Sequence, residues 1–427
     1  MKTIVIGAGP AGMAAAIACA NDSNEVILFE KNEKIGKKLF ITGKGRCNVT
    51  NACLRDEFFE NIVSNPKFLY SAFSNFDNFD LMDMIEQNGT PLKTERGNRV
   101  FPVSDHSSDI IKAFDHALKE NKVKVRLNDS VKSLIVEDIV NADKENKDKK
   151  DKEPLKIAKG IITDKGEKVY ADNVIVATGG ISYKSTGSTG DGLRWAGESG
   201  HRISSLKPAL VPLNSNDGWV TDLQGLTLKN VKLSLFIDSK CRFEEQGEML
   251  FTHFGISGPL VLSASSILAS YDSGDVYALI DLKPALSDEE FDARLIREFK
   301  EGNKKELKNI LGELYPVKLG LKIIELSDTD MYKKCNEITR EERLRILENT
   351  KRLRINISGT RGYDEAIITH GGVSTKDINP KTMESKAVKN LYFSGEVIDV
   401  DAFTGGFNIQ VAVSTGYLAG KSASAKE

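Results

Sequence analysis

The residues best suited to chemistry are three glycines near the start of the chain, in the segment GAGPAG at positions 7–12. The apolar run 4–6 leads directly into them, and a helix-forming run follows. In a strand–turn–helix unit with this spacing, the first glycine allows a tight turn and the second lets the backbone approach a pyrophosphate. The third lets helix and strand pack closely. Pro10 suits the first helical turn, where its missing N–H costs little. The segment therefore predicts a dinucleotide-binding site.

A second apolar strand, 26–29, ends at an acidic residue, Glu30. Glu30 follows Gly7 by 23 residues (30 − 7 = 23), close to the position of a carboxylate that binds ribose hydroxyls in such folds. Glycine turns are common and can be purely structural. Here the strand, the turn, the helix and the acid-ended strand all occur in the required order, which favours a dinucleotide site.

Residues 31–55 form a basic stretch that is interrupted by glycines. It contains seven Lys or Arg and one acid, Glu33. One interpretation is a solvated loop. Its position beside the glycine turn and its own glycines, Gly36, Gly43 and Gly45, favour a segment that covers the cofactor.

A second set of glycine turns lies far along the chain. The buried run 173–176 ends in ATGG at 177–180, and a strand expected over 391–394 ends at Gly395. Gly405 and Gly406 then precede another helix. In a parallel sheet, turns at the carboxyl ends of the strands meet the ligand. These turns are therefore expected on the ligand side of the same sheet as the first glycine turn.

Glycine turns at opposite ends of the chain suit a long ligand with phosphate in one part and a redox ring in another. FAD fits this arrangement better than NAD, whose domain need not be completed by the last residues of the chain. The start of a helix at Gly406 would stabilise negative charge on the pyrimidine edge of a flavin. An ordinary helix start is the structural alternative.

The composition is that of a globular protein with two or three domains: 427 residues, 28% charged, 40% hydrophobic, net charge −2. The longest uniform apolar run, 13–20, is too short to span a bilayer, and the first strand begins so early that no targeting segment is expected. The five cysteines have no metal-ligand spacing. We expect reduced thiols, no metal site and a cytoplasmic location.

The remaining pattern predicts an interrupted α/β domain. Helices are expected within 61–87 and over 107–120, a mobile hairpin tip over 138–153, and a β-rich region over 203–282. Helical composition with caps at Ser287 and Thr339 covers 287–350, and the run 366–370 is expected to complete the β domain. The predicted FAD-binding domain has two parts, 1–202 and 374–427. The predicted β-rich insert also has two parts, 203–283 and 351–373, and the helical subdomain covers 284–350.

These motifs resemble one family of two-dinucleotide-fold flavoproteins, the family that includes aminoacetone oxidase-like and dehydro-bile-acid reductase-like proteins. The resemblance is carried by GAGPAG, GKKLFITGKGRCNVTN, ATGG, TGSTGDG, THFGISGP and GEVIDVDAFTGGFNIQVA, which begin at positions 7, 36, 177, 186, 252 and 395. It implies FAD bound in a split Rossmann-like α/β domain, with a β-barrel-like insert and a small helical subdomain.

The resemblance also assigns roles to residues of the cofactor site. Glu30 would hold the adenosine ribose, Val131 would meet adenine through its backbone, and Arg46-Cys47-Asn48 would lie against the cofactor. The first turn of the last helix would cap the flavin. Asp399, with Asp401 as the competing choice, is a candidate for the ribityl or phosphate-side hydroxyls. The expected contacts are Gly7, Gly9, Pro10, Ala11, Gly12, Glu30, Lys31, Lys38, Gly45, Arg46, Cys47, Asn48, Val131, Thr178, Gly179, Gly180, Gly395, Glu396, Asp399, Gly406, Phe407, Asn408 and Ile409.

Catalytic residues are harder to find, because a flavin performs hydride chemistry with little help from side chains. His253 and His370 stand in glycine-containing segments, Thr-His-Phe-Gly and Thr-His-Gly-Gly, expected in the insert near its junction with the flavin domain. Either can donate a proton near neutral pH, and either can instead be a structural histidine. We select His253. Cys47 could face the flavin, and Tyr183 could contact substrate.

Three functions fit the sequence. The first is an FAD-dependent oxidoreductase that moves hydride between the flavin and a small amine or an unsaturated, steroid-like ketone. NAD(P)H or oxygen would be its redox partner. NAD(P)H is expected only as a transient donor, because no second GxGxxG turn follows a strand.

The second is a flavin-dependent nucleic-acid-modifying enzyme, and the third is a non-catalytic flavin-binding regulator. The near-zero net charge and the mixed signs of the helical insert argue against a nucleic-acid partner. The expected partner is a small-molecule substrate, with neither nucleic acid nor membrane. The oligomeric state is open.

Overall fold

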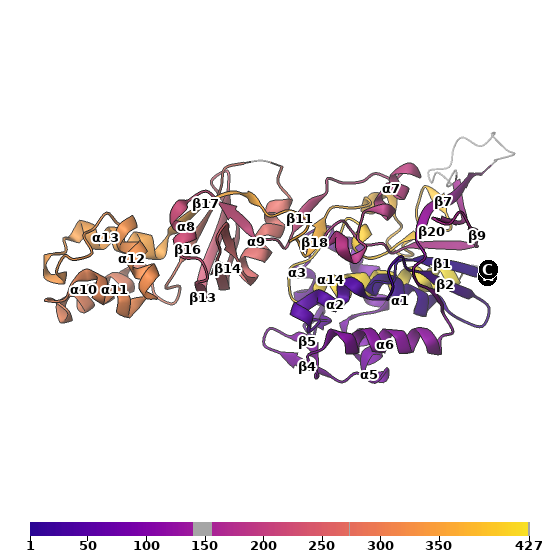
Figure 1. Ribbon diagram of the computed structural model, residues 1–427, viewed down its shortest axis with the longest axis horizontal. Helices are drawn as coiled ribbons and strands as arrows, with labels where there is room; N and C mark the ends of the chain where they lie inside the picture. Colours follow the sequence, from indigo (N-terminus) through magenta and orange to yellow (C-terminus); the bar gives the residue numbers. More distant parts are fainter. Residues whose placement is uncertain (140–155, 273, 426–427) are drawn as a thin grey trace. The chain divides into compact units, whose positions relative to one another are not determined.

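The computed structural model describes residues 1–139, 156–272 and 274–425. The chain divides into two compact units, Met1–Pro208 with Tyr363–Glu427, and Ala209–Gly362 (Figure 1). The first unit is therefore built from both ends of the sequence, as the expected split domain requires. The five-part division into domains stays a prediction. From residue 140 onward, the expected hairpin tip lies outside the described residues.

A five-stranded parallel sheet forms the centre of the first unit, in the order β20-β10-β1-β2-β6. The strands β1, β2, β10 and β20 are almost entirely buried, which explains their apolar runs, since parallel sheets are covered on both faces, whereas the edge strand β6 is partly exposed. The strands are β1 (Lys2–Ile6), β2 (Glu25–Phe29), β6 (Lys124–Arg126), β10 (Asn173–Val176) and β20 (Leu391–Phe393).

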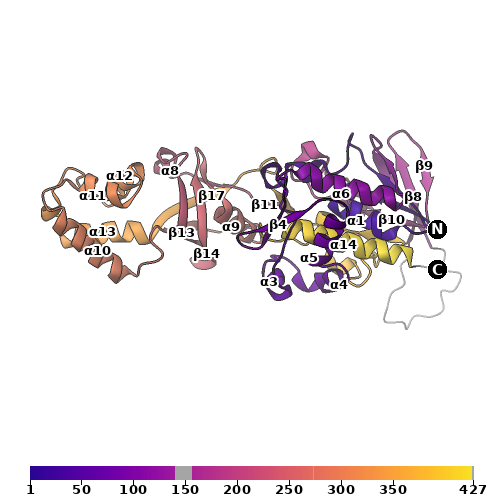
Figure 2. The same cartoon turned by 90° about the horizontal axis from the view of Figure 1, so that it is seen from below.

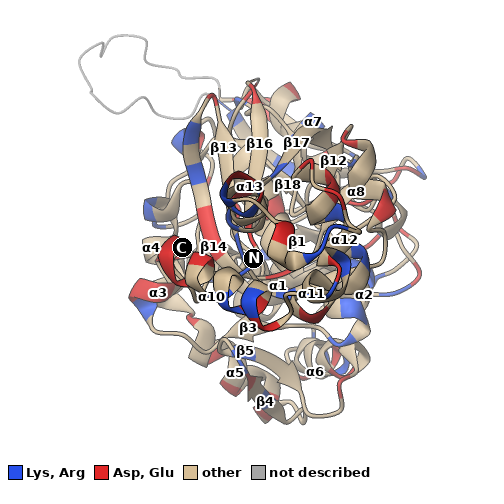
Figure 3. Ribbon diagram, turned by 90° about the vertical axis from the view of Figure 1, so that its left-hand side faces the viewer, with Lys and Arg blue, Asp and Glu red and all other residues tan. Residues whose placement is uncertain are grey.

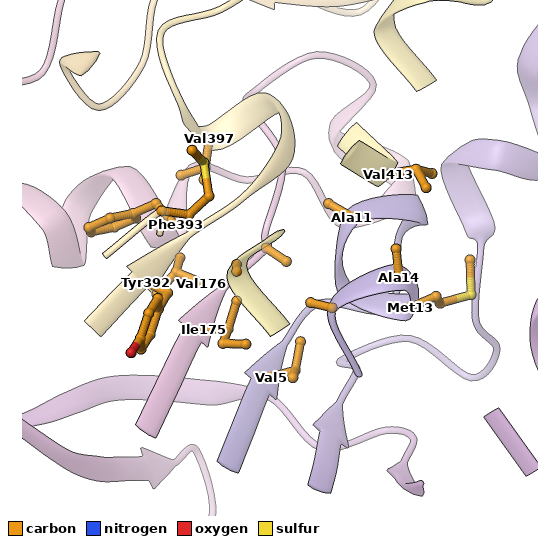
Figure 4. Close-up of a cluster of buried hydrophobic side chains, with 14 of the residues drawn as sticks. Val5, Ala11, Met13, Ala14, Ile175, Val176, Tyr392, Phe393, Val397 and Val413 are labelled. Carbon is orange, nitrogen blue, oxygen red and sulfur yellow. The ribbon is translucent and has the colours of Figure 1, made fainter. Parts of the chain in front are cut away.

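Two helices from opposite ends of the chain, α1 (Pro10–Cys19) and α14 (Phe407–Ser424), lie side by side (Figure 1; Figure 2). A Cβ at Gly416 would lie 2.1 Å from the carbonyl oxygen of Ala11, and a Cβ at Gly420 equally close to that of Ala15. Only glycine permits this approach. Figure 4 shows Ala11, Ala14 and Val413 within the buried cluster that surrounds the two helices.

The rest of the first unit surrounds this core. Its helices are α2 (Lys37–Ile41), α3 (Arg55–Glu60), α4 (Tyr70–Asn75), α5 (Asn78–Gln87), α6 (Ser107–Glu120) and α7 (Asp191–Glu198). One small sheet contains β3 (Thr50–Asn51), β4 (Leu92–Glu95) and β5 (Arg99–Pro102). A second contains β7 (Val131–Asp138), β8 (Lys156–Thr163), β9 (Lys168–Tyr170) and β19 (Val388–Lys389).

The second unit contains a closed six-stranded barrel, in the order β12-β15-β14-β13-β16-β17. The strands are β12 (Leu213–Ser215), β13 (Thr227–Ile237), β14 (Lys240–Phe251), β15 (Gly255–Ser257), β16 (Val276–Asp281) and β17 (Leu353–Thr360). Its helices are α8 (Gly218–Asp222), α9 (Pro259–Ala269), α10 (Asp288–Glu301), α11 (Leu307–Leu314), α12 (Val317–Leu326) and α13 (Arg340–Lys351). Ser287 and Thr339 form the predicted capping boxes of α10 and α13.

The structure refines one expectation from the sequence and corrects another. The region 203–282 is rich in strands, as expected, but it also contains the helices α8 and α9, which the sequence pattern did not indicate. The run 366–370 does not complete the barrel: β18 (Ile368–His370) pairs instead with β11 (Lys207–Ala209) in a separate two-stranded sheet. The Rossmann-type sheet and the barrel themselves agree with the predicted fold class.

Candidate cofactor site

The glycine turn follows β1 at the carboxyl edge of the central sheet. Gly7 has φ +101°, and a Cβ there would lie 2.6 Å from the carbonyl oxygen of Ala177. A Cβ at Gly12 would lie 1.8 Å from the carbonyl oxygen of Gly7, so the turn and the helix are in direct contact. At Gly9, by contrast, a Cβ would meet no atom of the described residues within 4 Å. The open approach at Gly9 is the feature that a pyrophosphate needs.

Glu30 lies at the same edge, directly after β2. Its Oε2 accepts a hydrogen bond from the backbone N–H of Ala8 (2.8 Å), within the glycine turn. Its Oε1 accepts from the backbone and side-chain amides of Asn32 (2.9 and 2.7 Å). A carboxylate has about four acceptor positions, so room is left for a ribose hydroxyl.

Both helices that begin at this edge lack a capping side chain. The N-cap residues are Gly9 for α1 and Gly406 for α14, and neither first turn contains an acidic residue. The first amides of a helix need acceptors, and a phosphate or an electron-rich ring edge supplies them. Uncapped starts at Gly9 and Gly406 fit the two ends of an extended cofactor.

Two buried polar atoms without a partner give a second test of the fit to FAD. Among the described residues, the Asn48 Oδ1 and Thr178 Oγ1 atoms are buried and have no hydrogen-bond partner. Both residues belong to the expected cofactor contacts. Buried polar atoms normally find partners, so a bound polar ligand is a reasonable explanation for both. The donor and acceptor set is therefore compatible with FAD.

The basic segment packs between the two ends of the chain. The Gly36 amide donates to the carbonyl of Ala8 (2.8 Å), and the Thr50 hydroxyl bonds the side chain of Gln410 in α14 (2.7 Å). A Cβ at Gly406 would lie 2.4 Å from the carbonyl oxygen of Thr50. The segment is thus not a free solvated loop but connects the glycine turn to α14.

Lys38 joins this segment to the last motif. Its ammonium donates to Glu396 Oε2 (2.8 Å) and to the hydroxyl of Ser182 (2.7 Å). Glu396 Oε1 also accepts from the backbone amide of Thr369 (2.8 Å). Lys38 and Glu396, both expected cofactor contacts, are therefore brought together by the fold.

Two other expected contacts have side chains that point elsewhere. The Arg46 guanidinium donates to Asp105 (2.6 Å) and Glu95 (2.5 Å), and these carboxylates raise its pKa. Cys47 is fully buried, and burial raises the pKa of its thiol to about 12, so the thiol stays neutral. We expect the backbone of this segment, not these two side chains, to meet the cofactor.

Further contacts expected from the sequence lie around the same unit. Lys31 donates to Thr189 (2.6 Å), in the glycine-rich segment before α7, and to Asp191 (2.8 Å), the first residue of α7. Val131 begins β7 and is buried. Burial raises the pKa of Asp399, whereas Asp401 is almost completely buried and bonded to protein groups. Contact of these residues with FAD stays a prediction.

The two histidine candidates have different surroundings. His253 lies between β14 and β15 in the second unit, is exposed, and stacks edge-on against Phe254 with centroids 4.9 Å apart. His370 belongs to the first unit, although the sequence placed it in the insert. Its Nδ1 lies 3.1 Å from Asp401 Oδ1. The Ser64 hydroxyl also bonds this carboxylate, and no sequence signal indicated Ser64.

Comparisons with known proteins agree with this geometry. The family model described as "HI0933-like protein Rossmann domain" matches residues 1–422. A 3-dehydro-bile acid delta(4,6)-reductase from Clostridium scindens is 29% identical over 98% of both chains. A ribosomal RNA dihydrouridine synthase from Haemophilus influenzae is 31% identical over 97% of this chain and 96% of its own.

Among solved structures, a 3-ketosteroid delta1-dehydrogenase from Sterolibacterium denitrificans matches 99% of both chains. Its TM-score is 0.52 at 14% identity, which shows a shared fold. Fold, site and relatives together define an FAD-dependent oxidoreductase of the Rossmann type. The chain belongs to the HI0933-like family. Among its described helices, none has the length and apolarity needed to cross a bilayer.

Proposed function

We propose that this protein is a reductase that saturates a carbon–carbon double bond conjugated to a carbonyl group. The observation that carries the proposal is the pair of full-length relatives. Their names describe the reduction of a 3-oxo bile acid at positions 4 and 6 and the formation of dihydrouridine. In both substrates the double bond is polarised by a carbonyl, so hydride adds to one carbon and a proton to the other.

The first unit supplies what this chemistry needs from a protein. Amides at the start of α1 would hold the pyrophosphate, Glu30 the ribose, and the start of α14 the flavin ring. Bound FAD, once reduced, supplies the hydride. The remaining task of the protein is to orient the substrate and to provide a proton. NAD(P)H as electron donor is part of the proposal, and an amine that reduces the flavin would indicate an oxidase instead.

A uridine within RNA is the second candidate substrate, favoured by the relative from Haemophilus influenzae. RNA binding generally needs a local excess of positive charge. Residues 209–362 carry 22 Lys or Arg and 24 Asp or Glu, a net charge of −2, and both α10 and α13 carry charges of both signs (Figure 3). This balance favours a small enone over a nucleic acid.

One experiment separates these possibilities. The purified holoenzyme is reduced anaerobically with dithionite and mixed with a 3-oxo-Δ4 steroid or with ribosomal RNA. Flavin reoxidation is followed by absorbance, and the product is analysed by mass spectrometry for the gain of two hydrogen atoms. Reoxidation by the steroid supports the main proposal, and reoxidation only by RNA supports the second. If neither reoxidises the flavin, the reductase proposal fails.

A further inference from the structure

The segment 369–372 is held at the carboxyl edge of the central sheet, beside the turns expected to bind FAD. A Cβ at Gly180 would lie 2.4 Å from Thr369 Oγ1, and a Cβ at Gly372 would lie 2.6 Å from the carbonyl oxygen of Val397. The Ile181 amide donates to Thr369 Oγ1 (2.8 Å). The segment is therefore in direct contact both with the turn after β10 and with the loop after β20.

Within this segment, His370 is paired with a buried carboxylate. The His370 Nδ1 and Asp401 Oδ1 atoms are 3.1 Å apart, and the side chain of Asp401 is only 2% exposed. The backbone amide of Asp401 donates to the Ser64 hydroxyl (3.0 Å), which in turn donates to Asp401 Oδ1. A carboxylate fixed in this way orients the ring, keeps the proton on Nδ1, and stabilises the charged imidazole.

The other ring nitrogen of His370 is left for a substrate. The His370 side chain keeps 15% of its surface exposed, and within the described part of the chain Nε2 has no hydrogen bond. The Asp401 Oδ2 atom is likewise buried without a partner among the described residues. The His370 ring is thus held through Nδ1, and its Nε2 atom is left for a substrate.

The pair also lies next to the helix that would cap the flavin. Ala402, directly after Asp401, donates its amide to Asn408 Oδ1 (3.0 Å) and accepts from Asn408 Nδ2 (2.7 Å). Asn408 is in the first turn of α14. The position of the pair is therefore fixed relative to the start of that helix.

We propose that His370 is the general acid of the reductase, giving its Nε2 proton to the substrate, and that Asp401 is its positioning residue. The inference rests on the proposed function, and it replaces His253 as the preferred proton donor. The carbon next to the carbonyl takes the proton as its neighbour takes the hydride. Two C–H bonds replace the π bond, the substrate gains two electrons, and the imidazole is left neutral until water reprotonates it.

The local charges favour a protonated ring. The charged groups that face His370 are Asp401 and Asp399 on the loop after β20, and Lys207 on β11. Burial lowers the pKa of His370, but the hydrogen bond and charge of Asp401 outweigh it, so the pKa is raised. A larger fraction of the ring then carries the transferable proton at neutral pH.

The kinetic test compares His370→Gln with the wild type and with His116→Gln, whose side chain is 55% exposed on α6. Each reduced holoenzyme is mixed with a 3-oxo-Δ4 steroid and, separately, with oxygen. General acids contribute roughly 10²–10⁴-fold, so we expect His370→Gln to slow reoxidation by the steroid by about that factor. Reoxidation by oxygen should be unchanged, because no substrate carbon is protonated in it. His116→Gln should match the wild type in both reactions.

A second readout needs neither cofactor nor activity. The five histidines are labelled with ¹⁵N and titrated by NMR in the wild type and in Asp401→Asn, and the His370 signal is assigned by its loss in His370→Gln. The wild type should show a proton on Nδ1 of neutral His370 and a midpoint that falls in Asp401→Asn. An unchanged midpoint overturns the assignment of Asp401.

The failures can be told apart. If the wild type reduces the steroid and His370→Gln reduces it equally fast, the reductase proposal stands and the acid role of His370 is wrong. If the wild type reduces no enone, the proposed function fails and the acid role fails with it, whatever the NMR titration shows.

Discussion

His253 and His370 stand in nearly the same short motif, a threonine before the histidine and a glycine close behind it. Their burial and their contacts in the folded protein nevertheless differ. His253 is exposed in the second unit with an aromatic neighbour. His370 is mostly buried in the first unit and is bonded to Asp401. The motif alone could not rank them, because the carboxylate that distinguishes them lies 31 residues further along the chain (401 − 370 = 31). The two histidines are therefore distinguished by the carboxylate that pairs with His370, not by their sequence neighbours.

After the rate loss expected for His370→Gln, the largest effect is expected at Glu30, and it tests whether the first unit binds the cofactor. Glu30→Ala removes the hydrogen bond to the turn and the expected charge-assisted bond to the ribose, which is worth about 1.5–3 kcal/mol, or roughly 10- to 100-fold in FAD affinity. Flavin content after purification and the dissociation constant for added FAD measure this change. Glu33→Ala, nearby and exposed, is the control. Undiminished affinity in Glu30→Ala would remove the basis for placing His370 beside a flavin.

A steric substitution tests the support of the His370 segment. Gly372→Ala places a Cβ 2.6 Å from the Val397 carbonyl oxygen, whereas a Cβ at Gly362 meets nothing within 4 Å. Overpacking of this kind costs about 1–3 kcal/mol. Urea unfolding of the apoprotein should show the loss for Gly372→Ala and little change for Gly362→Ala. Equal stability of both variants would contradict the close packing of Gly372 against the Val397 carbonyl group.

The ion pair predicts a pH dependence of stability. A group whose pKa is raised by folding adds stability below its unfolded pKa, and that contribution is lost as pH rises through the folded pKa. The wild type should therefore be more stable than His370→Gln in weak acid, and the difference should shrink as pH rises above the ordinary histidine range. Thermal midpoints between pH 5.5 and about 8.5 measure the trend. A difference independent of pH would indicate that His370 is not charged in the folded protein.

The smallest effect is expected at the other histidine. His253→Ala removes an exposed ring that contacts Phe254, and exposed substitutions change stability by less than about 0.5 kcal/mol. We expect FAD content to be intact and steroid reduction to change by less than about threefold, since no buried charge is uncovered. Steady-state rates at saturating steroid measure this. A large loss of rate would restore His253 as the proton donor and reverse the comparison.

Local patterns predicted the elements that hold the cofactor site. β1, α1 and β2 were expected from the glycine spacing and the apolar runs, and α6 was predicted with the bounds that the structure shows. Helix α9 was missed because it is buried on most of its surface, so its sequence PLVLSASSILA has no polar face to reveal a helical period. A helix is recognised in a sequence by the difference between an apolar and a polar face, and α9 lacks that difference.

The links between distant residues could not be predicted. Ser64, His370 and Asp401 are brought together only by the tertiary fold, and nothing about Ser64 in the sequence distinguishes it from other surface serines. The ion pairs of Arg46 with Glu95 and Asp105 are similar: a basic residue beside a glycine turn indicated a ligand contact, and the folded chain gave it two carboxylates. In both cases the partner residues are distant in the sequence, and only the tertiary fold brings them together.

The close fit of α1 against α14 also constrains how the protein is made. Their first residues are 397 positions apart (407 − 10 = 397), which takes a ribosome roughly 20–80 s to translate at 5–20 residues per second. Throughout that interval, the face of α1 that packs against Gly416 and Gly420 has no α14 to cover it. The packing of α1 against α14 can therefore form only after nearly the whole chain has been synthesised.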